Sequence, residues 1–200
     1  MNPEFWDTRY RDNLSAYGDE PNNYLVKRSI LFKPGMKILA AGEGEGRNAI
    51  WLSERNHEVW MVDYSRIGCK KASRQASIRN LPLKLICVDL AMWSWPINYF
   101  DAVIAIFLHL PPFIRPMVHL SMLQCLKSGG ILIMQTFHKN QLEYGTGGPK
   151  LVEMLYTADM LRKDFRDAHI LELEETVLEL NEGAFHEGPA AVINLTLRKN

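Results

Sequence analysis

The chain has 200 residues, 47% of them hydrophobic, and its 23 basic and 23 acidic side chains give a formal net charge of 0. This length suits one domain, and the hydrophobic content supports a sizeable core, which excludes a disordered chain. No basic stripe stands out, so nucleic acid is not expected as a partner. The three cysteines, Cys69, Cys87 and Cys125, contain no C-x-x-C pair, so neither a disulfide framework nor a zinc site is indicated.

The first residues, MNPEFWDTRYRDN, are polar and charged, unlike a signal peptide. The longest clean apolar run near the middle of the chain, AVIAIFL, is too short to span a bilayer. We therefore expect a cytoplasmic protein without a membrane partner.

The elements expected along the chain alternate between strand and helix. Residues 1–35 form an aromatic-rich leader, and residues 36–200 form an α/β core of the same domain. Short apolar runs predict strands at 37–41, 57–62, 83–88, 101–107 and 131–137, and helical spacing predicts helices at 45–55, 65–80 and 113–127. The last of these helices is expected to stop at Ser128-Gly129-Gly130. This alternation predicts a mostly parallel sheet with helices on both faces.

The last third of the chain has a different pattern. Residues 157–165 are expected to form a helix. Residues 169–180 and 184–200 then predict two strands joined by a hairpin through Asn181-Glu182-Gly183. Alternation of apolar and polar residues in the second strand is typical of a partly solvated antiparallel edge.

The stretch ILAAGEGEGRNAIWL, residues 38–52, contains three alternating glycines between a strand and a helix. Backbone N–H groups and the positive end of a helix bind a ligand at such a turn, and glycine lets the main chain approach closely. A tight turn without a ligand is the alternative. The spacing G-x-G-x-G departs from the dinucleotide pattern G-x-G-x-x-G, because Arg47 stands where the third glycine is needed. The Walker pattern is absent.

Acidic residues follow the next two expected strands. Asp63 is placed to accept hydrogen bonds from both hydroxyls of a ribose, because Ser65 is the better cap for the following helix. Asp89 is placed to accept from an adenine amino group, with Leu90 and Ala91 against the ring. A turn-forming role for Asp89 is an equal alternative.

In this arrangement the chain resembles the class I S-adenosylmethionine-dependent methyltransferases, and more closely their small tellurite-resistance and thiopurine-methyltransferase-like branch. The matching segments run in order from Phe5 to Leu195 and read FWDTRY, YGDEPNNYL, GEGEGRNAIWL, HEVWMVDYS, FLHLPP, LKSGG, LEYGTGGP and HEGPAAVINL. The resemblance implies a single-domain Rossmann-like fold with a mostly parallel seven-stranded sheet, an antiparallel last strand and S-adenosylmethionine as cofactor. One departure concerns the acid usually found two residues before the first motif glycine, which is Ala40 here. Glu43 and Glu45 are the candidates for its role.

The resemblance also implies site residues. The expected cofactor-binding residues are Gly42, Glu43, Gly44, Arg47, Asp63, Tyr64, Ser65, Asp89, Leu90, Ala91 and Ile106. The candidate catalytic residues are His109, Tyr144, Arg9 and Tyr17, and His186 also matches the family. His109 either contacts the substrate or orients its loop through a backbone carbonyl. Residues 140–155 are expected to form a flap over the site, with Tyr144 facing the substrate, and Arg9 or Arg47 is expected to bind the cofactor carboxylate.

The function expected from this resemblance is methyl transfer to a small-molecule nucleophile, with a thiol or chalcogen as the acceptor that the family suggests. The first alternative is a non-catalytic module or sensor that binds S-adenosylmethionine, which the residue Ala40 favours. A nicotinamide-dependent reductase is a weaker alternative, because Arg47 departs from the dinucleotide pattern.

Overall fold

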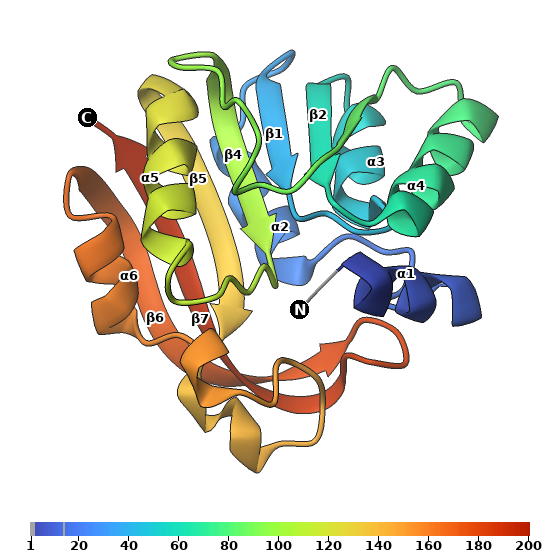
Figure 1. The fold of residues 1–200 in the computed structure, drawn as a ribbon. Coiled ribbons are helices and arrows are strands. Elements are labelled where there is room, and N and C mark those ends of the chain that lie inside the picture. The colour runs from blue at the N-terminus through green and yellow to red at the C-terminus, as the bar shows by residue number, and fades with distance from the viewer. Residues whose placement is uncertain (1–2, 14) are drawn as a thin grey trace.

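A seven-stranded sheet lies at the centre of the computed structural model, which describes residues 3–13 and 15–200 (Figure 1). The strand order is β3-β2-β1-β4-β5-β7-β6; β1 to β5 pair in parallel, and β7 is antiparallel to both of its neighbours. The fold predicted from the sequence is therefore confirmed. The strands are β1 (Lys37–Ala41), β2 (Glu58–Asp63), β3 (Lys84–Cys87), β4 (Phe100–Ile106), β5 (Leu126–Phe137), β6 (Ala168–Asn181) and β7 (Glu187–Lys199).

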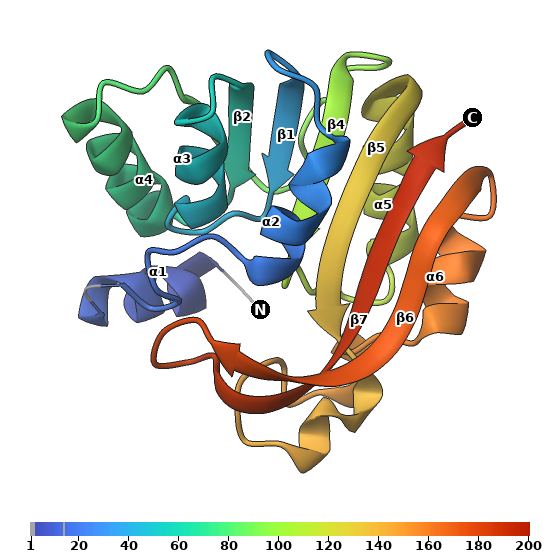
Figure 2. The ribbon, with the colours of Figure 1, turned by 180° about the vertical axis from the view of Figure 1, so that it is seen from behind.

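Helices cover both faces of this sheet. One face carries α2, α3 and α4, the other carries α5 and α6, and α1 lies beneath the carboxyl ends of the strands, beside α4 (Figures 1 and 2). None of the helices among the described residues is long and apolar enough to cross a membrane. The helices are α1 (Pro3–Asp12), α2 (Asn23–Arg28), α3 (Arg47–Ser53), α4 (Arg66–Ile78), α5 (Arg115–Cys125) and α6 (Ala158–Asp164), with short 3₁₀ helices η1 (Ser29–Leu31), η2 (Lys139–Glu143) and η3 (Val152–Met154).

The helix α5 ends earlier than its sequence pattern predicts. Its last residue is Cys125, and Leu126 already has an extended backbone. The carbonyls of Gln124 and Cys125 accept hydrogen bonds from the N–H groups of Asn98 and Tyr99, at 3.0 and 2.8 Å. The approach to β4 thus takes the last helical carbonyls, and the expected helix stop at residues 128–130 becomes the irregular start of β5.

The strand β7 is wrongly predicted as an edge, because β6 pairs with its outer side. Two of its polar residues, Asn194 and Thr196, are consequently buried and hydrogen-bonded. Asn194 accepts from Nε2 of Gln135 at 2.8 Å, and Thr196 lies 2.7 Å from the Tyr24 hydroxyl. The edge strand is β6, whose Glu172 forms an ion pair with Arg28 of α2.

The β6–β7 hairpin continues beyond the sheet. Pairing of β5 with β7 stops at Phe137 and Val192, whereas the β6–β7 ladder runs on to Asn181 and Glu187. We call residues 176–191 the hairpin extension. It bends across the carboxyl ends of the strands, and its tip points toward α1 (Figure 1). The carboxyl ends of the strands are therefore covered by the last third of the chain as well as by the leader.

Two glycines allow the hairpin tip to touch the leader. Gly183 has a φ of +82°, and a Cβ atom built on it would lie 2.4 Å from the backbone nitrogen of Gly18. A contact of that length with backbone cannot be relieved by a side-chain rotation. The tip is thus seated against residues 16–18 by close packing of main chain on main chain.

We expect Gly183→Ala to destabilise the protein by at least about 2 kcal/mol, since it combines a left-handed backbone with a backbone clash. The matched control is Gly35→Ala, because Gly35 has a φ of +73° but no atom within 4 Å of its added Cβ. That control is expected to cost only about 1 kcal/mol. Urea unfolding followed by circular dichroism measures both, and equal losses would show that the tip is loosely packed.

Candidate active site

The loop between β1 and α3 has backbone conformations that favour glycine at all three of its glycines. Gly42, Gly44 and Gly46 have φ values of +67°, +64° and +89°, all in the left-handed region. A Cβ on Gly42 would lie 2.6 Å from Cδ1 of Leu108, and one on Gly44 would lie 2.4 Å from the Tyr10 hydroxyl. The side chains of Leu108 and Tyr10 therefore approach the main chain at Gly42 and Gly44 more closely than any residue with a Cβ atom would allow.

Glu43 caps α3 from inside this loop. Its carboxylate accepts hydrogen bonds from the backbone N–H groups of Asn48 and Ala49, at 2.7 and 2.9 Å, and from the Asn48 side chain at 3.2 Å. Burial raises the pKa of Glu43, and these donors oppose that rise. Glu45 accepts from Ala16 N–H at 2.8 Å and pairs with Lys71. Both acids that sequence reasoning offered as replacements at Ala40 are therefore engaged in holding the loop.

Asp63 ends β2 opposite the glycine loop and is 6% exposed. Its two carboxylate oxygens accept from the N–H groups of Gly44 and Ser65, each at 2.8 Å. Burial raises the pKa of Asp63 against the effect of these hydrogen bonds. Two oxygens offer about four acceptor positions, so capacity for further donors is left. Burial, followed by the charge of Asp63, raises the pKa of the adjacent Tyr64 to about 12.

The other expected cofactor residues lie near the ends of the neighbouring strands. Ser65 caps α4 by accepting from Gly68 N–H at 3.0 Å, as the sequence predicts. Asp89 is exposed, and its Oδ1 atom accepts from Ala91 N–H at 2.8 Å, which is the turn-forming role. Leu90 and Ile106 are buried among the core side chains.

The helix α1 covers the space between the glycine loop and Asp63. Tyr10 is 5% exposed and stacks on Trp6, with ring centroids 5.7 Å apart. Burial raises the pKa of Tyr10, and the charge of Asp63 raises it further. Asp7 fixes the helix by accepting from Ser65 Oγ and Ile67 N–H, at 2.5 and 3.1 Å. The leader therefore acts as a cover over the carboxyl ends of β1 and β2.

A cluster of rings lies next to this cover, and we call it the aromatic cluster; its members are Tyr17, Phe107, Phe137, Phe185 and His186. The His186 ring lies 4.5 Å from the rings of Tyr17 and Phe107 and 5.2 Å from that of Phe137, measured between centroids. Phe107, at the end of β4, has a φ of +53°, an uncommon conformation for a bulky residue. The leader, two strand ends and the hairpin extension thus contribute rings to one place.

Arg9 and Tyr17, both proposed from the sequence as catalytic, meet at this cluster. The Arg9 guanidinium donates to the Tyr17 hydroxyl at 2.7 Å and lies 4.6 Å from the centroid of Phe185. Burial raises the pKa of Tyr17, although Arg9 opposes this. The guanidinium of Arg9 thus places one positive charge beside the rings of the aromatic cluster.

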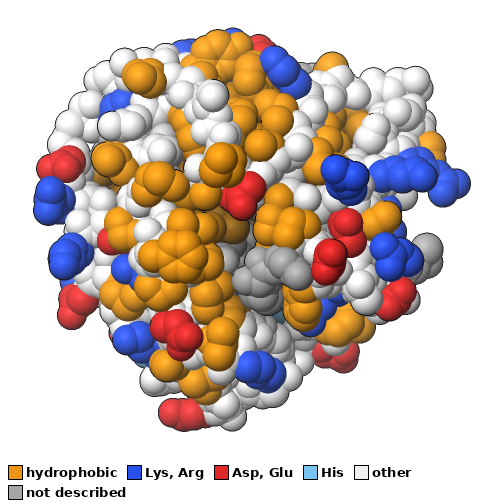
Figure 3. All heavy atoms as spheres, in the orientation of Figure 1, with side chains coloured by type: hydrophobic (Ala, Val, Ile, Leu, Met, Phe, Trp, Pro, Cys, Tyr) orange, Lys and Arg blue, Asp and Glu red, His pale blue; other side chains and the backbone are white. Residues whose placement is uncertain are grey.

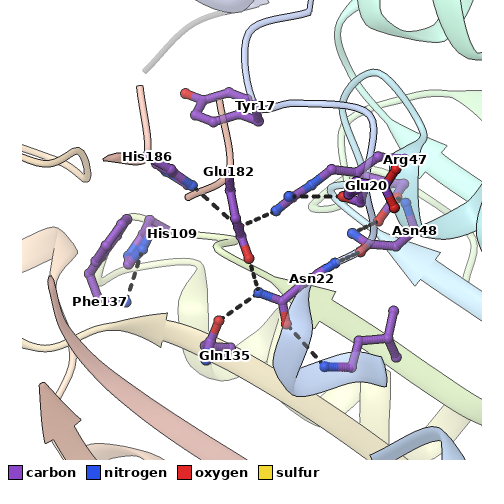
Figure 4. Close-up of polar contacts among 12 residues, drawn as sticks. Tyr17, Glu20, Asn22, Arg47, Asn48, His109, Gln135, Phe137, Glu182 and His186 are labelled. Atoms are coloured by element: carbon purple, nitrogen blue, oxygen red, sulfur yellow. Dashed lines mark hydrogen bonds and ion pairs between the residues drawn. The ribbon is translucent and has the colours of Figure 1, made fainter. Parts of the chain in front are cut away.

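The carboxylate of Glu182 is the centre of a buried polar network (Figure 4). It accepts from Asn22 Nδ2 at 2.8 Å and from Arg47 Nη2 at 2.5 Å. Asn22 also donates to Gln135 at 2.7 Å, and its backbone N–H donates to Asn48 at 2.9 Å. Arg47, expected to bind a cofactor carboxylate, is therefore paired with a carboxylate of the chain itself.

His186 lies on the other side of Glu182. Its Nδ1 atom is 3.8 Å from Oε2 of Glu182, and within the described part of the chain this nitrogen has no hydrogen-bond partner. Burial lowers the pKa of His186, although the neighbouring Glu182 opposes this fall. Sequence reasoning missed Glu182 and Asn22, because it assigned Glu182 to a turn; the i, i+4 pair of an acid and a histidine was the available signal.

His109 is held on both ring nitrogens. Nδ1 lies 3.0 Å from the Met154 carbonyl, and Nε2 accepts from Phe137 N–H at 3.3 Å. Burial lowers the pKa of His109 to about 4. Of the two roles left open by the sequence, these contacts favour orientation of the loop. Tyr144 is half-buried on the flap, and its side chain makes no hydrogen bond or ring contact with the residues that the structure describes.

We expect Glu182→Gln to destabilise the protein by about 3 kcal/mol at neutral pH, because it leaves the buried Arg47 charge without its partner. Burial alone raises the pKa of Glu182, but the neighbouring His186 and Arg47 outweigh it and lower that pKa to about 2. The stability from the depressed pKa is present above the unfolded value, about 4.3, and is lost as pH falls through 2.

The free energy of unfolding, measured by urea titration between pH 2 and 8, should therefore differ between wild type and Glu182→Gln above pH 4.3 and converge toward pH 2. The matched control is Glu179→Gln, an exposed acid on the same hairpin, whose expected cost is within about 0.5 kcal/mol. A pH-independent difference would contradict the proposed charge on Glu182.

The comparisons with known proteins agree with this architecture. Residues 38–130 match the family model described as a methyltransferase domain. The chain is similar to the structure described as "Conversion of a Disulfide Bond into a Thioacetal Group during Echinomycin Biosynthesis", with 17% identity, a TM-score of 0.80, and coverage of 99% of this chain and 91% of that one. No curated protein matches the chain.

Two further solved structures share the fold. TehB from Haemophilus influenzae has 18% identity and a TM-score of 0.75, and the match covers 90% of this chain and 62% of that one. A SAM-dependent methyltransferase from Aquifex aeolicus has 17% identity and a TM-score of 0.66, and the match covers all of both chains. At these identities the likeness concerns the fold, whereas the domain match covers the strands and loops that carry the glycines, Asp63 and Asp89.

Proposed function

We propose that this chain acts as a class I S-adenosylmethionine-dependent methyltransferase and transfers the methyl group to a small thiol or chalcogen acceptor. The match to a methyltransferase domain and the shared fold support the first part of the proposal. The observation that carries the proposal is Asp63, a buried carboxylate at the tip of β2 that is hydrogen-bonded to the glycine loop and retains acceptor capacity. Such an acid is suited to hold two ribose hydroxyls.

The residues at the carboxyl ends of the strands fit a nucleoside with an amino-acid tail. Asp63 would hold the ribose, and Asp89, exposed one strand further out, would meet the adenine amino group. The bare main chain at Gly42 and Gly44 would accommodate the tail. Arg47 would bind a carboxylate there if Glu182 yielded one of its contacts.

Access to this position requires the leader to move. The Tyr10 hydroxyl lies only 2.4 Å from the position that a Cβ of Gly44 would take, and Tyr10 itself is buried. A ligand lying along Gly44 would need that space, so α1 and residues 15–18 would have to shift and then close again. Closing would exclude water from the reacting atoms.

The acceptor side favours a soft nucleophile. The bound cofactor supplies a methyl group already activated on a sulfonium, so the chain's main task is to align the acceptor in a water-poor place. The aromatic cluster provides apolar walls, and Nδ1 of His186, which has no hydrogen-bond partner among the described residues, would accept the proton of a thiol. One of the structures with a similar fold is described with the words "Conversion of a Disulfide Bond into a Thioacetal Group", which is chemistry at sulfur.

Calorimetry with S-adenosylmethionine and S-adenosylhomocysteine tests the first half of the proposal. A methyl-transfer assay with small thiols and selenols, with phenols and amines as the comparison, tests the second half. We expect binding of both nucleosides and turnover of the sulfur and selenium compounds. Faster turnover of the phenols or amines would exclude the thiol and chalcogen class.

A second candidate is a sensor that binds the nucleoside without catalysis, and Ala40 favours it because no acid stands at the usual position for the methionine amine. Engagement of Glu43 and Glu45 within the loop adds to this argument. Tight binding together with absence of turnover across the whole acceptor panel would favour the sensor.

We expect Asp63→Asn to weaken the binding of S-adenosylmethionine by at least about tenfold, equivalent to about 1.4 kcal/mol, because charged acceptors of the ribose hydroxyls are lost. Isothermal titration calorimetry measures the change. Asp159→Asn, an exposed acid on α6, is the control and should bind like wild type. Unchanged affinity in a folded Asp63→Asn variant would place the nucleoside elsewhere.

A further inference from the structure

Two thiols lie next to the backbone of Asp63 and Tyr64. Cys69 is buried in the first turn of α4, and Cys87 is the exposed last residue of β3. Cys87 is paired with Asp63 in the ladder between β2 and β3. The fold thus places both cysteines beside Asp63 and Tyr64, although Cys69 and Cys87 are 18 positions apart in the sequence.

The thiols reach consecutive carbonyls of one loop. Sγ of Cys69 donates to the Asp63 carbonyl at 3.6 Å, and Sγ of Cys87 donates to the Tyr64 carbonyl at 3.8 Å. The Asp63 carbonyl also accepts from the N–H group of Val88, the residue after Cys87, at 2.9 Å. The backbone N–H group of Val88, next to Cys87, and the thiol of Cys69 therefore meet at a single oxygen atom.

The electrostatic environments of the two thiols are linked as well. Burial raises the pKa of the Cys69 thiol most, and the charge of Asp63 and then the neighbouring Cys87 raise it further. The third cysteine provides the contrast, because buried Cys125 at the end of α5 donates to the Met122 carbonyl at 3.2 Å. Only the first two cysteines thus share a partner loop.

We infer that Cys69 and Cys87 form an oxidisable pair whose disulfide lowers the affinity of the cofactor site. With a peroxide as oxidant, exposed Cys87 is first oxidised to the sulfenic acid and one water is released. The Cys69 sulfur then attacks the Cys87 sulfur and the S–O bond breaks. The proton of the Cys69 thiol passes to the leaving hydroxyl, so a second water leaves as the S–S bond forms. A thiol reductant reverses the reaction.

The disulfide would act on the ligand contacts through α4. Its S–S bond of about 2.05 Å is shorter than any non-bonded contact between two sulfur atoms, so the first turn of α4 is drawn toward β3. In that turn Gly68 packs against the Gly44 carbonyl, where an added Cβ would lie 2.7 Å away. The Asp63 carbonyl loses its sulfur donor at the same time. Asp63 and the glycine loop are therefore disturbed together; this effect rests on the proposed function.

The test uses the full chain, treated with hydrogen peroxide and then freed of it. We expect a loss of about 2 Da, the mass of two hydrogens, and a peptide map that joins Cys69 to Cys87. Calorimetry should show at least about fivefold weaker binding of S-adenosylmethionine after oxidation, fully restored by dithiothreitol. Cys87→Ser should bind like the reduced protein and be insensitive to peroxide, whereas Cys125→Ser should respond like wild type.

Two results would overturn the inference: a map without the Cys69–Cys87 link, or an oxidised, linked protein with unchanged affinity. Failure of the proposed function has a different signature, namely absence of binding by the reduced protein. In that case the peptide map alone still shows whether Cys69 and Cys87 form a disulfide.

Discussion

One buried carboxylate, Glu182, holds together parts of the chain that the fold otherwise leaves separate. It joins the hairpin extension to Arg47 at the start of α3 and to Asn22 before α2, across 135 and 160 residues. A charge removed from water is stable only when its partners are in place. The leader, the glycine loop and the hairpin extension are therefore positioned as a unit, and the aromatic cluster exists only in that arrangement.

The sequence is most informative where function depends on local pattern. The strand β1 has the predicted bounds, and Asp63 and Ser65 lie at the adjoining ends of β2 and α4 because strand and cap signals are short-range. Glu43 is less predictable, since an acid between glycines fits a ligand contact and a helix cap equally well. Its partners Asn48 and Ala49 settle the capping role only in three dimensions.

The remaining differences arise from contacts between distant segments. The early end of α5 depends on donors from residues 98 and 99, and the buried polar side of β7 depends on Gln135 and Tyr24. The period-2 pattern of β7 is that of an edge, but amide and hydroxyl partners allow such residues inside. A single sequence carries no record of which distant residue supplies a partner.

The hairpin extension also fixes the order in which the residues of the Glu182 network are synthesised. Glu182 leaves the ribosome after Asn22, Arg47 and Gln135, the residues to which the network of Figure 4 connects it. The chain is synthesised from its amino terminus, so the residues of the glycine loop and of the central strands emerge before the hairpin extension that lies across them. Until Glu182 has emerged, the Arg47 charge lacks its buried partner, so the leader, the glycine loop and the hairpin extension are joined only afterwards.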